Sequence, residues 1–195
     1  IKAGSPNYAV QFCRIEESKV YGDSPTQGPL REESPLLYLA RNWQTQLTRN
    51  EHAEIRSELK KTIEAIYSCL YQYEREFSGE QDFFRLRGQD NLFRYLPIGK
   101  VTVRMHPDDG LVETLIRIAA ARIAKCKVEI SLPTDLNNSV TEFLAGTDGK
   151  RLCDSVEILT ENDENLADRI LVTDPPSKID RVRYALPNRV PQIIH

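Results

Sequence analysis

Apolar positions recur at helical spacing between residues 50 and 77, with Glu and Lys on the opposite face. The pattern predicts one long amphipathic helix that ends at the Ser78–Gly79 pair. Because the stripe lasts only about three heptads, packing within the chain is favoured over a coiled coil with a partner, which stays as an alternative. A shorter helix is predicted over residues 36–47, with Ser34 as its N-cap and Pro35 at its first position.

Beyond residue 90 the pattern changes to short apolar runs separated by helical stretches. Strands are expected over residues 99–106, 126–133 and 155–160. Helices are expected over residues 110–125, 137–146 and 164–171, the second of which Asp135 could cap. Alternation of strand and helix is typical of a parallel sheet with right-handed crossovers. We therefore expect an α/β fold, with a small Rossmann-like parallel sheet and flanking helices, preceded by a helical segment and an extended N-terminal arm.

Proline and glycine divide the chain into three parts. Residues 1–34 contain a strand-like stretch at Tyr8–Arg14 and turn-forming residues, so they are interpreted as an extended arm and linker that ends an upstream catalytic domain. Residues 35–79 form the helical segment, and residues 80–195 form the Rossmann-like α/β domain, which opens with a loop over 80–90 and ends with two strand-like pieces. A lone edge strand exposes unpaired backbone groups, so the first 30 residues are expected to pack poorly or to pair with a neighbouring molecule.

The charge and hydropathy of the chain give no support for nucleic acid or a membrane as its partner. The chain has 195 residues with 26 basic and 29 acidic side chains, well mixed, for a net charge of −3. This balance gives no electrostatic reason to expect nucleic acid or an anionic membrane surface. No run of 18 apolar residues is present to span a bilayer. Arginine and aromatic residues interleave between residues 83 and 95 and could stack bases, but acidic neighbours cancel their field.

The cysteines give no metal-site spacing. Each lies in an apolar stretch, which is typical of reduced, mostly buried thiols in a cytoplasmic protein, and a nucleophilic thiol is the alternative. They are Cys13, Cys69, Cys126 and Cys153.

The turn after the first predicted strand does not suit a dinucleotide. A dinucleotide site needs a glycine-rich turn that leads to a helix N-terminus. Here the turn is "MHPDDG", and Asp108 and Asp109 stand where the pyrophosphate would lie. Two carboxylates would repel phosphate, so we expect them to cap the following helix themselves. The stretch "AGTDGKR" (Ala145–Arg151) contains GxxGK without the full phosphate-loop spacing, and a turn between helix and strand explains it better.

His106 is the one histidine placed where α/β sites form, at a strand end beside Asp108 and Asp109. It could act as a general base, whereas a capped strand-to-helix turn is the alternative. His52 and His195 lie far from it in the sequence. A stand-alone small enzyme or ligand-binding domain built on this turn is therefore one hypothesis, and a helical interaction module built on residues 50–77 is another.

Both ends of the chain also carry a resemblance to a known family. "KAGSPNY" (Lys2–Tyr8), followed by "AVQF", resembles the closing segment of aldehyde dehydrogenases of the L-glutamate γ-semialdehyde (1-pyrroline-5-carboxylate) branch, with Ser5 in place of a glycine. "GQDNLFRYLPIGKVTVR" (88–104) and "RVRYALPNRVPQIIH" (181–195) are similar to pieces of the C-terminal extension of long proline utilisation A proteins. Residues 35–78 carry no such motif.

The resemblance implies a parent that is a bifunctional proline dehydrogenase and NAD-dependent semialdehyde dehydrogenase, with NAD and FAD as its cofactors. In that family the catalytic cysteine, the general-base glutamate and the NAD-binding turn lie upstream of the closing segment. No catalytic, cofactor-binding or metal-binding residue is therefore expected in this chain. It would be a non-catalytic accessory domain, structural or assembly in role, that contacts the upstream catalytic domains of the same chain or supports a homo-oligomer.

Overall fold

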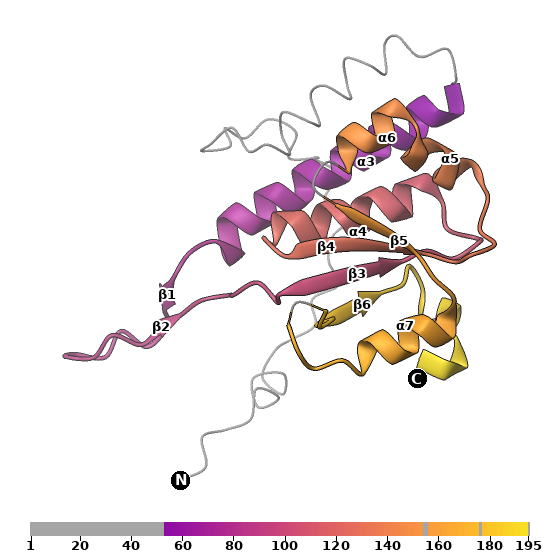
Figure 1. The fold of residues 1–195 in the computed structure, drawn as a ribbon. Coiled ribbons are helices and arrows are strands. Elements are labelled where there is room, and N and C mark those ends of the chain that lie inside the picture. Colours follow the sequence, from indigo (N-terminus) through magenta and orange to yellow (C-terminus); the bar gives the residue numbers. More distant parts are fainter. Residues whose placement is uncertain (1–52, 154–155, 176, 195) are drawn as a thin grey trace.

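The computed structural model describes residues 53–153, 156–175 and 177–194. The described chain begins with helix α3 (Ala53–Gln72), which passes into a π-helical turn, η1 (Tyr73–Phe77). A two-stranded antiparallel hairpin follows, formed by β1 (Gln81–Asp82) and β2 (Leu92–Phe93). This hairpin extends away from the rest of the molecule, at the left of Figure 1.

Four parallel strands form the central sheet, in the order β5-β4-β3-β6. Their bounds are β3 (Lys100–Arg104), β4 (Lys127–Leu132), β5 (Glu157–Thr160) and β6 (Arg181–Arg183). Counted from β3, the order is 3-2-1-4, which is that of the first strands in a dinucleotide-binding fold. The predicted fold class, a small Rossmann-like parallel sheet with flanking helices, is therefore confirmed.

Helices connect successive strands of this sheet. Helix α4 (Leu111–Ile123) joins β3 to β4, and α7 (Asp163–Ile170) lies between β5 and β6. Two short helices, α5 (Ser139–Ala145) and α6 (Thr147–Leu152), precede β5. Two 3-10 turns, η2 (Pro187–Arg189) and η3 (Gln192–Ile194), follow β6.

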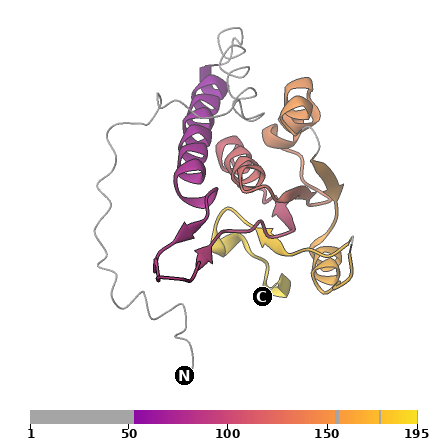
Figure 2. The ribbon, with the colours of Figure 1, turned by 90° about the vertical axis from the view of Figure 1, so that its left-hand side faces the viewer.

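The two faces of the sheet differ in chemistry because side chains alternate along each strand. On β3, Val101 and Val103 point to the face covered by α4, whereas Thr102 and Arg104 point to the face covered by α7. Strand β4 repeats the alternation in register, since Val103 pairs with Ile130 and Arg104 pairs with Ser131. Figure 2 shows α3 and α4 together on one side of the sheet and α7 on the other.

The apolar face holds the core. One cluster joins the sheet to α4 and α5 and includes Leu59 of α3. A second cluster joins α3 to the end of α4, through Ile63, Ile66 and Leu70 packed on Ala119 and Ile123. The apolar stripe of the predicted long helix is therefore used within the chain, as the preferred interpretation expected.

Several local predictions are wrong. Of the two strand-like pieces predicted at the end of the chain, only β6 is a strand, and the 3-10 turns η2 and η3 follow it. Asn138, not Asp135, caps α5, because its Oδ1 accepts the backbone N–H groups of Val140 and Thr141 at 3.1 and 3.0 Å. The GxxGK stretch is not a simple turn, since α6 begins at Thr147 within it. The predicted loop over 80–90 contributes a strand, β1, to the hairpin.

Several expectations concern parts of the chain that lie outside the described residues. They are the arm and linker over 1–34, the helix over 36–47, and the positions of Cys13, His52 and His195. In the ranges that are described, none of the helices combines the length and the apolar character that crossing a membrane requires.

Candidate functional site

The carboxyl ends of β3 and β6 form the place where an open α/β sheet binds its ligands. From β3, the chain passes through α4 to β4 on one side, while β6 lies against β3 on the other side. Crevices at such a change of direction are the usual ligand sites of this architecture. The turn Met105–Gly110, with the predicted His106, Asp108 and Asp109, leads from β3 into α4 at this point.

Asp109 lies buried in this crevice, with its carboxylate between two guanidinium groups. Its Oδ2 accepts hydrogen bonds from Arg117 at 2.5 Å and from the backbone N–H of His106 at 3.1 Å. Its Oδ1 accepts a hydrogen bond from Arg189 at 2.6 Å. Arg189 comes from η2 and also reaches Glu113 at 2.9 Å. Two carboxylates and two guanidinium groups thus fill the crevice and neutralise one another.

Arg117 binds together the strand ends that form the crevice. Its Nη1 donates to the backbone carbonyl oxygens of Arg104 at 3.0 Å and of Arg183 at 3.3 Å. These two residues end β3 and β6, respectively. The same side chain therefore pairs with Asp109 and fixes the spacing of the two strands.

The helix cap differs from the expected one. Neither Asp108 nor Asp109 caps α4; the N-cap is Gly110, whose N–H donates to Glu113 at 3.1 Å. Asp109 turns away from the helix N-terminus because Arg117 and Arg189 offer it full positive charges, which bind a carboxylate more strongly than backbone dipoles. The pKa of Glu113 is held below its ordinary value by Arg189, and then by the Gly110 N–H.

His106 is not arranged as a catalytic base by the residues around it. Its Nδ1 accepts the backbone N–H of Asp108 at 3.2 Å and lies 3.5 Å from the carboxylate of that residue, which is exposed. The buried carboxylate of Asp109 contacts the backbone of His106 and not its ring. The sequence neighbours His106, Asp108 and Asp109 are thus close in space but do not form one chemical unit.

The described cysteines are free thiols, but only Cys153 is buried, whereas Cys69 and Cys126 are half-buried, so the prediction of mostly buried thiols is only partly correct. Burial raises the pKa of Cys69, and it raises that of Cys153 to about 11. A thiol with a raised pKa is mostly protonated at neutral pH and is a poor nucleophile. Cys126 is half-buried, and its Sγ donates to the carbonyl oxygen of Ala124 at 3.7 Å. Within the described ranges, no group of three or more His, Cys, Asp or Glu side chains could hold a metal ion.

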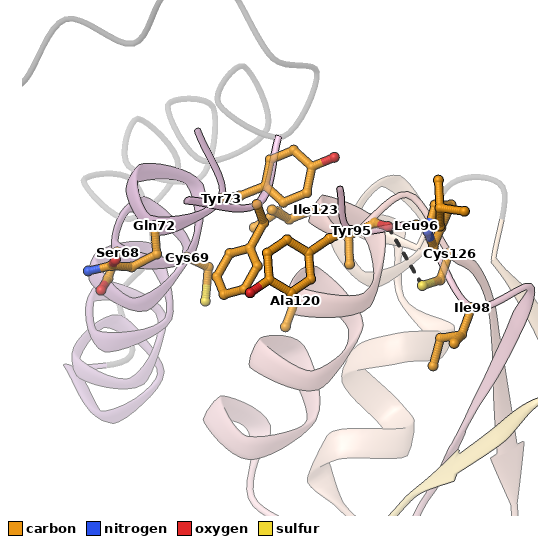
Figure 3. Close-up of a pocket in the computed structure, with 13 residues that line it drawn as sticks. Ser68, Cys69, Gln72, Tyr73, Tyr95, Leu96, Ile98, Ala120, Ile123 and Cys126 are labelled. Atoms are coloured by element: carbon orange, nitrogen blue, oxygen red, sulfur yellow. Dashed lines mark hydrogen bonds between the residues drawn. The ribbon is translucent and has the colours of Figure 1, made fainter. Parts of the chain in front are cut away.

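An apolar pocket of about 430 Å³ lies where η1 and the end of α4 meet the chain that returns from the hairpin. Figure 3 shows Cys69 at the left, Leu96 and Ile98 at the right, and Tyr73, Ile123 and Ala120 between them. Its volume falls within the range of about 300–1,000 Å³ that small-molecule sites occupy.

Aromatic and aliphatic side chains continue from this pocket along the hairpin. We call residues 77–98 the aromatic hairpin. Its rings form a chain, with centroid separations of 4.8 Å for Phe77–Tyr95, 5.2 Å for Tyr95–Phe93 and 5.9 Å for Phe93–Phe83. Phe83 and Phe84 are exposed to 67% and 73%, and further exposed members are Leu86, Leu92, Phe93, Tyr95, Leu96 and Ile98.

A second group of charges, on the face under α7, was missed by sequence reasoning. Glu129 is 2% exposed, and its Oε1 accepts hydrogen bonds from Thr102 at 2.8 Å and from Arg169 of α7. Its Oε2 lies 3.4 Å from Lys100 Nζ. Burial alone would raise the pKa of Glu129, but the hydrogen bonds from Arg169 and Thr102 outweigh burial and lower it.

Arg104 and Glu161 complete this group. Arg104 is 2% exposed and donates to Ser131 at 2.9 Å, to the Glu161 backbone at 3.0 Å and to Asp163 at 2.7 Å. Glu161 in turn accepts hydrogen bonds from Ser131 and Arg169, each at 2.5 Å. The signal that could have predicted this group is the alternation in "KVTVR" and "KVEISL", because parallel strands covered on both faces are normally apolar throughout.

Comparison with known proteins adds no relative. No protein-family model, no curated protein and no solved structure matches the chain. The resemblance at residues 2–12, 88–104 and 181–195 therefore depends on those short stretches alone.

Proposed function

We propose that this chain is a non-catalytic accessory domain, with an assembly role, in the C-terminal region of an NAD-dependent aldehyde dehydrogenase that oxidises glutamate semialdehyde in proline catabolism. The parent would be cytoplasmic, would bind NAD, and would bind FAD if it also carries proline dehydrogenase activity. Its nearest partners would be the upstream catalytic domains of the same chain. The family assignment rests on the short stretches quoted above, and the assembly role rests on the structure of the aromatic hairpin.

The exposed apolar surface of the aromatic hairpin is the observation that carries the assembly role. Its exposed side chains include Phe83, Phe84 and Leu96, each with two thirds or more of its surface facing solvent. Large exposed apolar patches mark protein–protein interaction sites. The hairpin also lies apart from the sheet, so a partner can reach it from both sides (Figure 1).

The filled crevice beside β3 supports the non-catalytic part of the proposal. A pyrophosphate bound there would meet Asp109 and Glu113, and it would have to displace Arg189 from both of them. Displacement would leave a buried carboxylate short of one partner, which makes binding costly. Two of the described thiols, Cys69 and Cys153, are poor nucleophiles, since burial raises their pKa values.

A binding experiment with NAD tests the proposal that the domain is non-catalytic. Thermal unfolding of this chain should be unchanged by NAD at millimolar concentration. A ligand at 100 times its Kd would add about 2.7 kcal/mol to the free energy of unfolding if it bound the native state. A saturable rise of the melting temperature with NAD would overturn the non-catalytic assignment and would favour a ligand-binding domain.

Substitution on the aromatic hairpin tests the assembly role. When this chain is added in trans to the catalytic portion of the parent, Phe83→Ser with Phe84→Ser should weaken their association by at least about tenfold, because large exposed aromatic anchors dominate interface energies. Association is measured by sedimentation of the catalytic portion with this chain added in trans. The melting temperature of the isolated chain should be the same with and without the two substitutions, since both side chains are exposed. Unchanged association would contradict the assembly role of the hairpin.

Binding of a small apolar molecule is the second candidate function, favoured by the 430 Å³ pocket. A fluorescent apolar dye is a suitable probe, because occupancy of the pocket would raise its emission. The variant Ala120→Trp, which places a large ring at the pocket wall, should abolish the signal if the dye binds there.

A further inference from the structure

Helix α7 is attached to the sheet mainly by charge. Leu166 is its buried residue, whereas α4 buries a run of side chains on the opposite face. Those side chains of α4 are Leu111, Thr114, Leu115, Ile118, Ala119 and Ile123. Other anchors of α7 are Arg169, which reaches Glu129 and Glu161, and Asp163, which reaches Arg104. Helix α7 also packs on η3, which would have to separate from it or move with it.

The charges under α7 form a closed and balanced set, which we call the ion cluster. Its members are the cations Lys100, Arg104 and Arg169 and the anions Glu129, Glu161 and Asp163. Thr102 and Ser131, both fully buried, supply the hydroxyl groups that link them. Each cation has an anion within the cluster, so the closed state holds no unpaired buried charge.

Such a cluster holds a helix in a defined place without adding much net stability. Removing charged groups from water is costly, and the attraction between the ions roughly offsets that cost. When α7 lifts, its charges and those of the sheet regain their hydration. When α4 lifts, a large apolar surface is exposed to water, and no hydration of charged groups offsets that cost. The two helices that cover the sheet should therefore open at very different rates.

We propose that α7 is an electrostatically latched cover, which lifts from the polar face of the sheet as a unit while α4 and the strands stay folded. Lifting would uncover Arg104, Ser131 and Glu161, which lie at the carboxyl ends of β3, β4 and β5. That edge is where α/β sheets present polar groups to ligands. This inference does not depend on the proposed function.

Hydrogen exchange of the full chain at neutral pH tests the latch. The amides of α7, such as Leu166, whose N–H donates to the Asn162 carbonyl at 3.1 Å, should exchange at least about 100-fold faster than the central amides of α4. Equal protection of the two helices would mean that they open together, and it would overturn the proposal.

The variant Arg169→Met gives the second readout. It leaves Glu129 and Glu161 without their α7 partner in the closed state, so exchange of α7 should rise at least a further tenfold while that of α4 is unchanged. Asp168→Asn is the matched control, because Asp168 lies on the same helix outside the ion cluster, and it should leave both rates unchanged. If Arg169→Met accelerates α4 as much as α7, the cluster supports the whole domain and α7 is not an independent cover.

Discussion

Buried charge decides the behaviour of individual residues at the carboxyl end of this sheet. Asp108 and Asp109 are adjacent in the sequence, and sequence reasoning assigned them one joint role. The structure separates them, because the Asp109 side chain is fully buried between two arginines whereas that of Asp108 is 77% exposed. Hydrophobic periodicity cannot distinguish such neighbours, since the decisive partner, Arg189, lies 80 residues away in the chain.

The same substitution at these two positions should therefore have very different effects. Asp109→Asn removes a buried charge and leaves Arg117 and Arg189 without it, so we expect the free energy of unfolding to fall by roughly 3–5 kcal/mol. Asp108→Asn should change it by less than about 0.5 kcal/mol, as is usual for exposed positions. Urea denaturation, monitored by circular dichroism, measures the free energy of unfolding of both variants. Similar losses for the two variants would contradict the ion pairs described here.

At the scale of elements, periodicity predicted the long regular pieces and failed at the short ones. Helix α3 and helix α4 have wide apolar stripes, so their sequences predict them well. Strands β1 and β2 are two residues each, which is too short for an alternating pattern to predict them. Helix α6 begins directly after Gly146, where the glycines of "GTDGK" suggested a turn.

Close packing between α5 and α6 explains why a glycine, Gly149, lies inside α6. A Cβ at this position would come closer than 3.0 Å to backbone atoms of Phe143 and Leu144, so α5 and α6 can pack this closely because a hydrogen occupies the site. Gly149→Ala should therefore destabilise the domain by about 1–3 kcal/mol, as overpacking does. Gly79→Ala is the control, because a Cβ added there would meet no other atom within 4 Å. Equal melting temperatures for the two variants would show that α6 does not pack as described.

At the scale of the whole molecule, the sequence predicts the sheet but not the chemistry of its faces. The parallel pairing of the strands follows from the alternation of strands and helices, whereas the order β5-β4-β3-β6 does not, because other parallel orders obey the same crossover rule. The pairing of Glu129 with Arg169 depends on how α7 crosses the sheet, which is a tertiary fact with no local signal. The candidate site is likewise assembled from distant segments, so only its β3–α4 turn could be found from the sequence.

Glu129 of the ion cluster should contribute to the loss of stability of the domain at acid pH. The folded-state pKa of Glu129 is lowered, so the unfolded state binds its proton more readily than the folded state does. The stability that this carboxylate contributes is present above its unfolded pKa of about 4.3, and it is lost as the pH falls through the lower folded value. The variant Glu129→Gln cannot titrate, so its stability at neutral pH should be lower and its fall below about pH 4.3 should be shallower. Urea midpoints measured between pH 7 and pH 3 compare the two chains, and parallel acid slopes would contradict this role of Glu129.

Cys153 should make the domain less stable as the pH rises into the alkaline range, whereas Glu129 does so as the pH falls. Its folded pKa is about 11, against an ordinary value of 9.0, so the unfolded chain loses this proton first. The stability contributed by the protonated thiol is complete below pH 9.0 and is lost as the pH rises towards about 11. Urea midpoints between pH 8 and pH 11 should therefore fall less steeply in Cys153→Ala than in the unsubstituted chain, whereas Cys126→Ala, at a half-buried position, serves as the control. An identical alkaline slope in Cys153→Ala would show that Cys153 is more accessible to water than the structure indicates.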